Sequence, residues 1–442
     1  MSGHAWRKTA SLCVESMEPR LVLSTTPSSV RAILYSPPGT ALVRPNLPVV
    51  PYGVATSAVS FVDPSAGIGH GEHVVIGQRD FIGPFAKLDA RGGYIKVGNL
   101  STVLDNATIL ANPTGKGSQG VVIGQSVLIG YGATVRGPAT IGAFGNSVQV
   151  TSIGSGALID GGNVEQGAVV GALARVGPGV TIPTGMRVLP GKNVTTNAEA
   201  SSPALGKVVP VTAADLSAAG QTLLNSASLA SGYTNVFQGS TATGTPPGFD
   251  TGSGIPIPNN GNLALLLGTG PEPGTSAVSF EPVRQSPTFA AATNKPYAGQ
   301  FNSSPFRSTG QVIFGQTARQ VSSAVGHRNA IRGDQGQPIR IGSIAKTGNA
   351  VTITSPVGGQ LAIGNGFRAG GGTVILGGSS GVSTFGNDVA VGTGSVVTGS
   401  SLGAGTKVGS RAYVANSTLA ADTVVPDGAI LINNVRQGTV EW

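Results

Sequence analysis

The stretch VVIGQSVLIGYGATVRGPATIG, residues 121–142, decides the fold of this 442-residue chain. Its aliphatic residues Ile123, Ile129, Val135 and Ile141 recur every six positions, which fits neither the 3.6-residue period of a helix nor the alternation of a simple strand. In a hexapeptide repeat, a short strand carries the aliphatic side chain inward and a small residue turns the chain, so three repeats close one triangular coil. Coils stack by parallel pairing at about 4.8 Å, and each aliphatic residue lies on its counterpart about eighteen residues away. The stretch therefore predicts a parallel β-helix.

The hexapeptide spacing continues on both sides of this stretch and then begins a second time. The first series also includes Val97, Val103, Ile109, Val164, Val170, Val176, Ile182, Val188 and Val194. The second includes Ile341, Ile363, Ile375, Val391, Val397, Val408, Val414 and Val425, with five-residue steps at Leu402 and Leu419. SAVSF occurs at residues 57–61 and again at 276–280, so the chain contains a duplication. The second series is less regular, and we expect GGSSGVSTFGND, from Gly377, to loop out.

These series divide the chain into four parts. Residues 1–52 form an N-terminal segment and tether, 53–238 a first solenoid with a C-terminal helix, 239–275 a Gly/Pro-rich linker, and 276–442 a second solenoid. The helix is predicted over residues 212–231, where Thr212 and Asp215 resemble a capping box. Its apolar stripe consists of Leu216, Leu223, Leu224 and Leu229. We expect this helix to pack along the outside of the coil.

Composition excludes several classes of function. The chain has 69 Gly and only 10% charged residues, which suits a β-solenoid and does not suit disorder. Its net charge of +8 comes from scattered Lys and Arg without interleaved aromatic residues, so we predict no nucleic-acid partner. Cys13 is the single cysteine, which excludes an intrachain disulfide and a cysteine-based zinc site. No apolar run reaches the ~20 residues of a transmembrane helix.

The N-terminal segment points to export. The core VESMEPRLVLS resembles the LEPR-type segment at the start of many exported and cell-surface bacterial proteins, with Met17 where that motif usually has Leu. Residues 25–51 are rich in Ser and Pro, as in a flexible tether. An exported, periplasmic or cell-surface protein is therefore expected, with an ordinary leader of a cytoplasmic protein as the alternative.

Both solenoids resemble the gamma-class carbonic anhydrases, which are left-handed β-helix proteins that form trimers with zinc between neighbouring subunits. In the first solenoid the resemblance rests on residues 82–112, on the opening stretch, on VGPGVTIPTGMRVLPG and on LASGY near Tyr233. In the second it rests on RGDQGQPIRIG from Arg332 and on VVPDGAIL near Val424. The resemblance implies an all-β fold of two tandem left-handed parallel β-helices, with an α-helix after the first.

The zinc ligands of that family are not retained. Its mechanism needs three neutral imidazoles on a zinc ion, which lowers the pKa of a bound water to about 7. The resemblance places Leu110, Tyr131 and Arg136 at those positions in the first solenoid and Thr354, Gly371 and Leu376 in the second. Leucine and glycine offer no side-chain donor, and arginine adds a fixed positive charge. Zinc is the cofactor that the resemblance implies, but this sequence predicts none.

Other family positions are also changed. Gly92, Thr114 and Gln335 stand at or near the sites of proton-handling glutamates, and Leu104 and Gly348 stand at the active-site glutamine. Asp105, Arg332 and Asp334 keep residues that in relatives take part in contacts between subunits, so they are candidate interface residues, with solvated surface charge as the alternative. His70 and His73 form H-x-x-H, which we interpret as a polar entry turn because two ligands alone make a weak metal site.

Three hypotheses remain open from the sequence. The first is a catalytically degenerate scaffold that binds or assembles without chemistry, either as a homotrimer or as a pair of solenoids within one chain. The second is an enzyme, either a carbonic anhydrase with unconventional ligands or another activity in the same cleft. The third is a subunit that assembles with an intact relative supplying the histidines.

Overall fold

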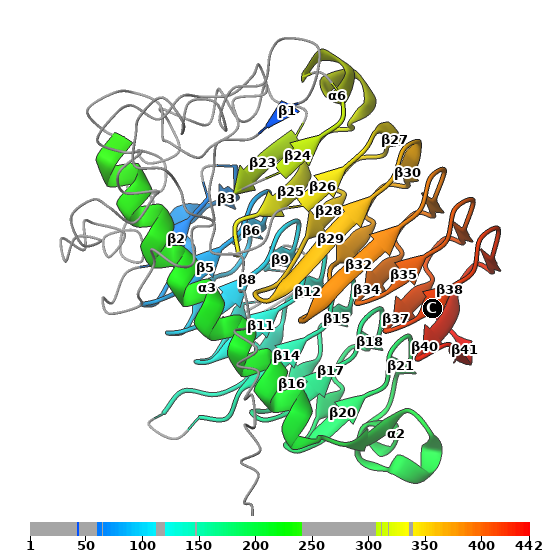
Figure 1. The fold of residues 1–442 in the computed structure, drawn as a ribbon. Coiled ribbons are helices and arrows are strands. Elements are labelled where there is room, and N and C mark those ends of the chain that lie inside the picture. The colour runs from blue at the N-terminus through cyan, green and yellow to red at the C-terminus, as the bar shows by residue number, and fades with distance from the viewer. Residues whose placement is uncertain are drawn as a thin grey trace, which may run out of the picture.

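A computed structural model of the chain describes residues 42–43, 60–63, 65–111, 120–145, 148–240, 306–310, 312–316, 318–335 and 339–442. The structure consists of two triangular β-solenoids that lie side by side, with one long helix along the first (Figure 1). The LEPR-type segment, most of the tether, the linker and the repeat of SAVSF at 276–280 lie outside the described residues.

The first solenoid has three parallel faces. Face 1a comprises β3 (Gly67–Gly69), β6 (Lys87–Asp89), β9 (Thr108–Leu110), β12 (Thr134–Arg136), β15 (Leu158–Asp160), β18 (Arg175–Val176) and β21 (Asn193–Val194). Face 1b comprises β4 (Val74–Val75), β7 (Ile95–Val97), β10 (Val121–Ile123), β13 (Ala139–Ile141), β16 (Asn163–Val164) and β19 (Thr181–Ile182). Face 1c comprises β2 (Phe61–Val62), β5 (Phe81–Ile82), β8 (Thr102–Val103), β11 (Val127–Ile129), β14 (Thr151–Ile153), β17 (Val169–Val170), β20 (Met186–Val188) and the antiparallel β22 (Val208–Pro210).

The second solenoid repeats this order of faces. Face 2a comprises β23 (Phe306–Gly310), β25 (Asn329–Gly333), β28 (Thr352–Thr354), β31 (Val374–Leu376), β34 (Val396–Thr398), β37 (Tyr413–Ala415), β40 (Ala429–Ile432) and the antiparallel β41 (Val435–Thr439). Face 2b comprises β1 (Leu42–Val43), β24 (Val312–Phe314), β26 (Ile339–Ile341), β29 (Gly359–Ile363), β32 (Gly381–Phe385), β35 (Ser401–Leu402) and β38 (Thr418–Leu419). Face 2c comprises β27 (Ile344–Thr347), β30 (Phe367–Ala369), β33 (Ala390–Val391), β36 (Lys407–Val408) and β39 (Val424–Val425).

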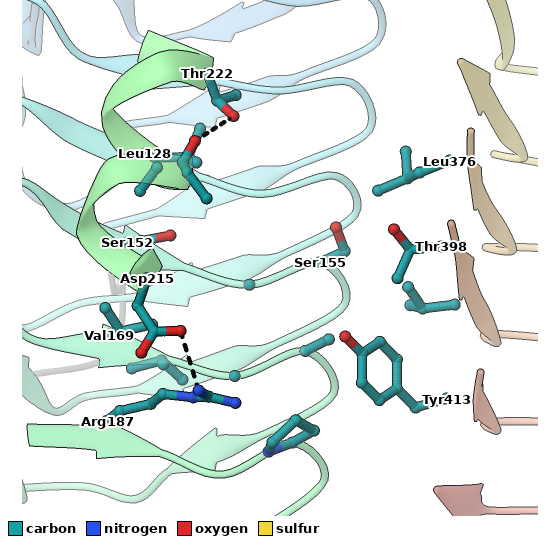
Figure 2. A pocket seen from close by; sticks show the side chains of 18 of the residues that line it. Leu128, Ser152, Ser155, Val169, Arg187, Asp215, Thr222, Leu376, Thr398 and Tyr413 are labelled. Carbon is teal, nitrogen blue, oxygen red and sulfur yellow. Dashed lines mark hydrogen bonds and ion pairs between the residues drawn. The ribbon is translucent and has the colours of Figure 1, made fainter. Parts of the chain in front are cut away.

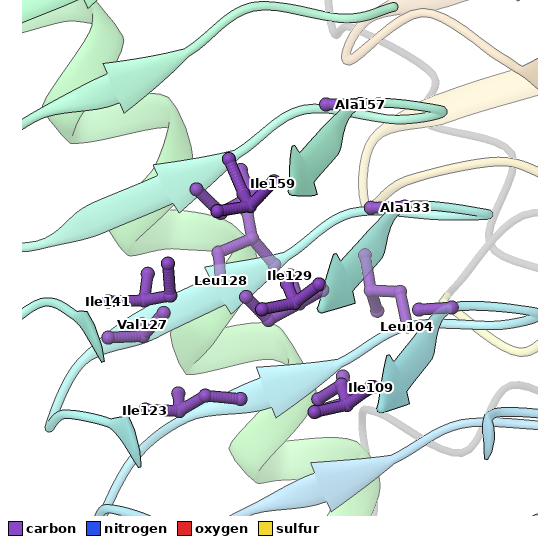
Figure 3. Packing of buried hydrophobic residues seen from close by; sticks show 14 of the residues in the cluster. Leu104, Ile109, Ile123, Val127, Leu128, Ile129, Ala133, Ile141, Ala157 and Ile159 are labelled. Carbon is purple, nitrogen blue, oxygen red and sulfur yellow. The ribbon is translucent and has the colours of Figure 1, made fainter. Parts of the chain in front are cut away.

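The hexapeptide positions form the two cores, as predicted. Ile123, Ile129, Val135 and Ile141 are fully buried inside the first solenoid, and Figure 3 shows the isoleucines of successive coils stacked on one another. The second core is built in the same way around residues such as Ile353. The structure is thus a pair of left-handed parallel β-helices of the hexapeptide-repeat type.

Coil length departs from the predicted eighteen residues in both solenoids. In the first, Val103 pairs with Ile129, 26 residues later, whereas Val170 pairs with Val188, eighteen residues later. In the second, Ile353 pairs with Ile375, 22 residues later, and farther along Val397 pairs with Val414, 17 residues later. The additional residues of the longer coils lie in the turns that lead from face 2a to face 2b and in the face 2b strands themselves. Strands β29 and β32 have five residues each, whereas β35 has two.

The loop predicted from Gly377 is only partly a loop. Residues 381–385 form strand β32, and each of the five pairs in register with a residue of β29. The prediction was wrong here because Phe385 turns inward to the core, where only 4% of it is exposed, and this holds the strand in the ladder. A short turn, residues 377–380, precedes the strand.

Helix α3 (Ala213–Ser240) follows the first solenoid and packs along face 1c, as predicted, but it is longer than 212–231. Thr212 caps its start: the Asp215 backbone N–H donates to Thr212 Oγ1, and the Thr212 backbone N–H donates to the Asp215 carboxylate. Leu223 is buried under the helix, whereas Leu224, predicted in the apolar stripe, is 55% exposed. The buried side follows Ala219, Leu223 and Ser226, a spacing that leaves Leu224 facing outward.

Short helices complete the fold: η2 (Gly71–His73), α2 (Asn197–Ser201), η3 (Pro203–Leu205) and α6 (Ala318–Ala324). Strand β1, which lies inside the predicted tether, pairs antiparallel with β24 at the edge of face 2b. In the part of the chain that the structure describes, no helix is long and apolar enough to cross a membrane.

Candidate functional site

The two solenoids pack against each other within one chain. Face 2a lies against the corner of the first solenoid that joins faces 1c and 1a. Across this contact, Asn106 Nδ2 donates to Thr352 Oγ1 at 3.1 Å, and Trp442 Nε1 donates to the Leu173 carbonyl at 2.6 Å. Val374 and Val396 of face 2a are buried in the core cluster of the first solenoid. The pair within one chain, one of the two predicted arrangements, is therefore present in this structure.

A buried ionic cluster joins the two solenoids. Arg332 Nε donates to Asp105 Oδ2 at 2.8 Å, and Arg332 Nη1 donates to Asp334 Oδ2 at 3.0 Å. The side chains of all three residues are 1% exposed or less. The guanidinium carbon also lies 5.6 Å from the ring centroid of Phe81. The residues predicted at a subunit interface thus meet at the contact between the two solenoids of one chain.

Burial dominates the electrostatics of this cluster. It raises the pKa of Asp105 from 3.8 to about 6, although the charge of Arg332 opposes the shift. Two carboxylates compete for one guanidinium here, and the nearby Asp334 raises the pKa of Asp105 further. Such a cluster is costly to disrupt because any charge left without its partner stays away from water.

A groove runs beside the cluster, between helix α3, the corner of the first solenoid and face 2a. It consists of two adjoining cavities of about 460 and 610 Å³, which share Ala214, Ala218, Thr222, Leu376 and Thr398 in their walls. We call it the inter-solenoid groove. Figure 2 shows one of the cavities, with Leu376, Thr398 and Tyr413 pointing from the second solenoid towards the first.

The long coils of the second solenoid build one wall of this groove. Pro356 and Val357, from the turn between β28 and β29, line the larger cavity together with Gly377, Gly378 and Ser379 from the next turn. The hexapeptide pattern alone did not predict this wall. The 22-residue spacing of Ile341, Ile363 and Phe385 was a signal that could have located it.

The six positions at which the resemblance expects zinc ligands lie in three places. Tyr131, Thr354 and Leu376 line the larger cavity together. Leu110 and Arg136 are paired neighbours on face 1a and line a separate cavity of about 540 Å³. Gly371 lies elsewhere, beside the backbone of Asn349. One position from the first solenoid and two from the second are therefore brought together inside one chain.

The groups in the larger cavity are hydroxyls, amides and apolar side chains. Burial raises the pKa of Tyr131 to about 12, with a hydrogen bond to the Gln335 side chain among the smaller opposing effects, so the phenol stays protonated near neutral pH. Thr354 Oγ1 donates to the Arg332 carbonyl at 3.0 Å. Neither group is a neutral imidazole or a thiolate, the donors that zinc prefers beside carboxylates.

The smaller cavity contains one ion pair. Arg187 Nη1 donates to Asp215 Oδ1 at 3.0 Å, which fixes the first turn of α3 to strand β20 (Figure 2). Hydrogen bonds from Thr212 and the charge of Arg187 outweigh burial and lower the pKa of Asp215. The ion pair therefore fixes the position of helix α3, which forms one wall of the groove.

The remaining predicted positions lie outside the groove, except for Gln335. Leu104 is buried, Gly92 occupies a turn with φ of +76°, Gly348 directly follows β27, and Thr114 is outside the described residues. His70 lies near the start of the first solenoid, with Nδ1 3.4 Å from Asp89 Oδ1. Within the described ranges, no three His, Cys, Asp or Glu side chains are grouped as a metal site would require.

Comparisons with known proteins add the following. No family model and no curated protein matches the chain. Among solved structures, a hexapeptide transferase family protein from Anaplasma phagocytophilum has 20% identity and a TM-score of 0.30, covering 39% of this chain and 91% of its own. UDP-N-acetylglucosamine acyltransferase from Francisella novicida has 20% identity and a TM-score of 0.16, covering 31% and 63%. Similarity at this level assigns neither an activity nor a partner.

Proposed function

We propose that this chain is a catalytically degenerate relative of the gamma-class carbonic anhydrases that acts as a binding or structural scaffold. One observation carries the proposal. Tyr131, Thr354 and Leu376, which stand where the resemblance expects one ligand from one unit and two from its neighbour, meet in a single cavity without an imidazole. A leucine side chain cannot coordinate a metal, and a phenol with a pKa near 12 is a poor zinc ligand.

We further propose that the solenoid pair of one chain replaces the subunit contact of the trimer. Arg332 of the second solenoid covers Asp105 at the corner of the first, so a second chain could reach that corner only if the second solenoid left it. Face 1a, the equivalent of face 2a in the first solenoid, also differs from it in its outward side chains. On face 1a, Arg136, Asp160 and Arg175 stand at the positions of Leu376, Thr398 and Tyr413. Charged side chains of this kind favour contact with water over burial.

Two experiments test these points. Stopped-flow measurement of carbon dioxide hydration by the full chain with added zinc should give the rate of buffer, and a chelator-sensitive rate would overturn the proposal. Light scattering at micromolar concentration should give the mass of one chain, whereas a stable trimer would show that another surface of the chain assembles. Export to the periplasm or cell surface rests on the N-terminal sequence alone, and cell fractionation tests it.

A further inference from the structure

Face 2c of the second solenoid carries a row of like charges. Along its strands, the outward residues that pair in register are Lys346, Arg368, Ala390 and Lys407. All three basic residues are exposed. We call them the cationic row. Lys346 and Arg368 are one strand spacing apart, about 4.8 Å, and Arg368 and Lys407 are two spacings apart.

The first solenoid arranges its charges differently. On face 1a, Asp160 lies between two arginines and pairs with Arg136 at 3.4 Å and with Arg175 at 2.7 Å. In the described part of the chain, no such ion pair is formed by any residue of the cationic row. The nearby acids Asp388 and Asp422 sit in turns, where their side chains lie against Gly366 and Gly405 of the preceding coil.

Face 2c also differs from its counterpart in what covers it. Helix α3 lies over face 1c, where it contacts β2, β5, β11 and β14. On face 2c the described contact with a helix is at the end of the sheet, where α6 packs on β27. In the middle of the cationic row, Arg368 of β30 and Lys407 of β36 are both exposed.

Like charges directly opposite each other in a sheet are destabilising. A ligand with negative groups along the row would remove this cost and would gain charge-assisted contacts from each cation. We propose that the cationic row is a binding surface for a linear acidic polysaccharide. This surface is on a different face from the inter-solenoid groove, so the inference does not rest on the function proposed above.

The outward side chains of face 2c favour an acidic polysaccharide over a nucleic acid as the partner. Proteins that bind single strands use a groove with aromatic side chains on which bases stack. The outward residues of face 2c are Lys, Arg, Ala and Val, with no aromatic residue among them. Cations that are one and two strand spacings apart along one face of a sheet instead match an extended polymer that carries carboxylates at repeated intervals.

Binding of the full chain to immobilised polygalacturonate tests the proposal, with neutral dextran and single-stranded DNA as parallel arms. The row variant is Lys346→Gln/Arg368→Gln/Lys407→Gln. The matched control is Lys87→Gln/Arg91→Gln/Arg136→Gln, which removes the same charge from exposed residues that have carboxylate neighbours. Thermal unfolding of each variant verifies folding, and the row variant should be at least as stable as the unmodified chain because a like-charged contact is removed.

The unmodified chain should bind polygalacturonate at low salt and lose affinity as salt rises. At about 1 kcal/mol for each of the three basic residues, the row variant should bind about a hundredfold more weakly, with the control little changed. Equal losses in both variants would show a net-charge effect and overturn the inference. So would an unmodified chain that does not bind polygalacturonate, or one that binds DNA more tightly through the same row.

Discussion

Replacement of Arg332 by methionine should destabilise the protein strongly. Arg332 donates to two carboxylates that are fully buried, and the Arg332→Met change leaves both without the guanidinium. Breaking a buried ion pair from one side costs about 3–5 kcal/mol. Arg136 pairs with Asp160 while its side chain is 53% exposed. The matched change Arg136→Met should therefore cost only about 0–1 kcal/mol.

The cost of Arg332→Met should also depend on pH. Without the guanidinium, Asp105 must take up a proton to remain buried, and that proton costs about 1.4 kcal/mol for every pH unit above the normal pKa of an aspartate. The variant should therefore lose more stability at pH 8 than at pH 5. Adding Asp105→Leu and Asp334→Leu removes both charges and should restore most of the loss.

Urea unfolding followed by circular dichroism, at both pH values, measures these differences. A loss for Arg332→Met that matches Arg136→Met at both pH values would refute the buried cluster. The same result would show that the pairing of the two solenoids does not depend on this polar contact.

Four other variants test the core, the pH dependence and the helix. Ile129→Asp should cost several kcal/mol, because its charge would be stranded in an apolar core, and unchanged thermal stability would contradict the β-helix assignment. Asp105 has a raised pKa, so its contribution to stability is full below pH 4 and is lost as the pH rises through about 6. Between pH 5 and 7 the unmodified chain should lose stability that Asp105→Asn retains. Parallel curves of stability against pH for the two proteins would argue against the raised pKa of Asp105. Leu223→Ala should cost about 2–5 kcal/mol and Leu224→Ala under about 0.5 kcal/mol, measured by thermal unfolding; equal costs would contradict the helix orientation.

The sequence could predict the interior of each solenoid because the hexapeptide spacing acts locally. Each inward residue, such as Ile129 or Val397, needs only its own turn and the coil above or below it. The capping pattern at Thr212 likewise located the start of α3. The end of the helix was predicted at residue 231 and this was wrong, because no proline interrupts the sequence before Pro246 and the helix continues to Ser240.

The pairing of the two solenoids could not be read from the repeat, because it depends on outward residues. Arg332 and Asp105 are 227 positions apart, and nothing in their local sequence shows that they meet. Val374 and Val396 look like ordinary outward positions until the second solenoid is placed against the first. The sequence grouped Leu110, Tyr131 and Arg136 as one lost site, whereas the structure groups Tyr131 with Thr354 and Leu376.

We propose that the inter-solenoid groove retains the place of a zinc site without its ligands. Zinc content after exposure to zinc and dialysis, measured for the full chain and for Tyr131→His/Thr354→His/Leu376→His, tests this. We expect the unmodified chain to retain well under one equivalent and the variant to retain close to one, since its three imidazoles would line one cavity. One equivalent of tightly held zinc in the unmodified chain would contradict the claim.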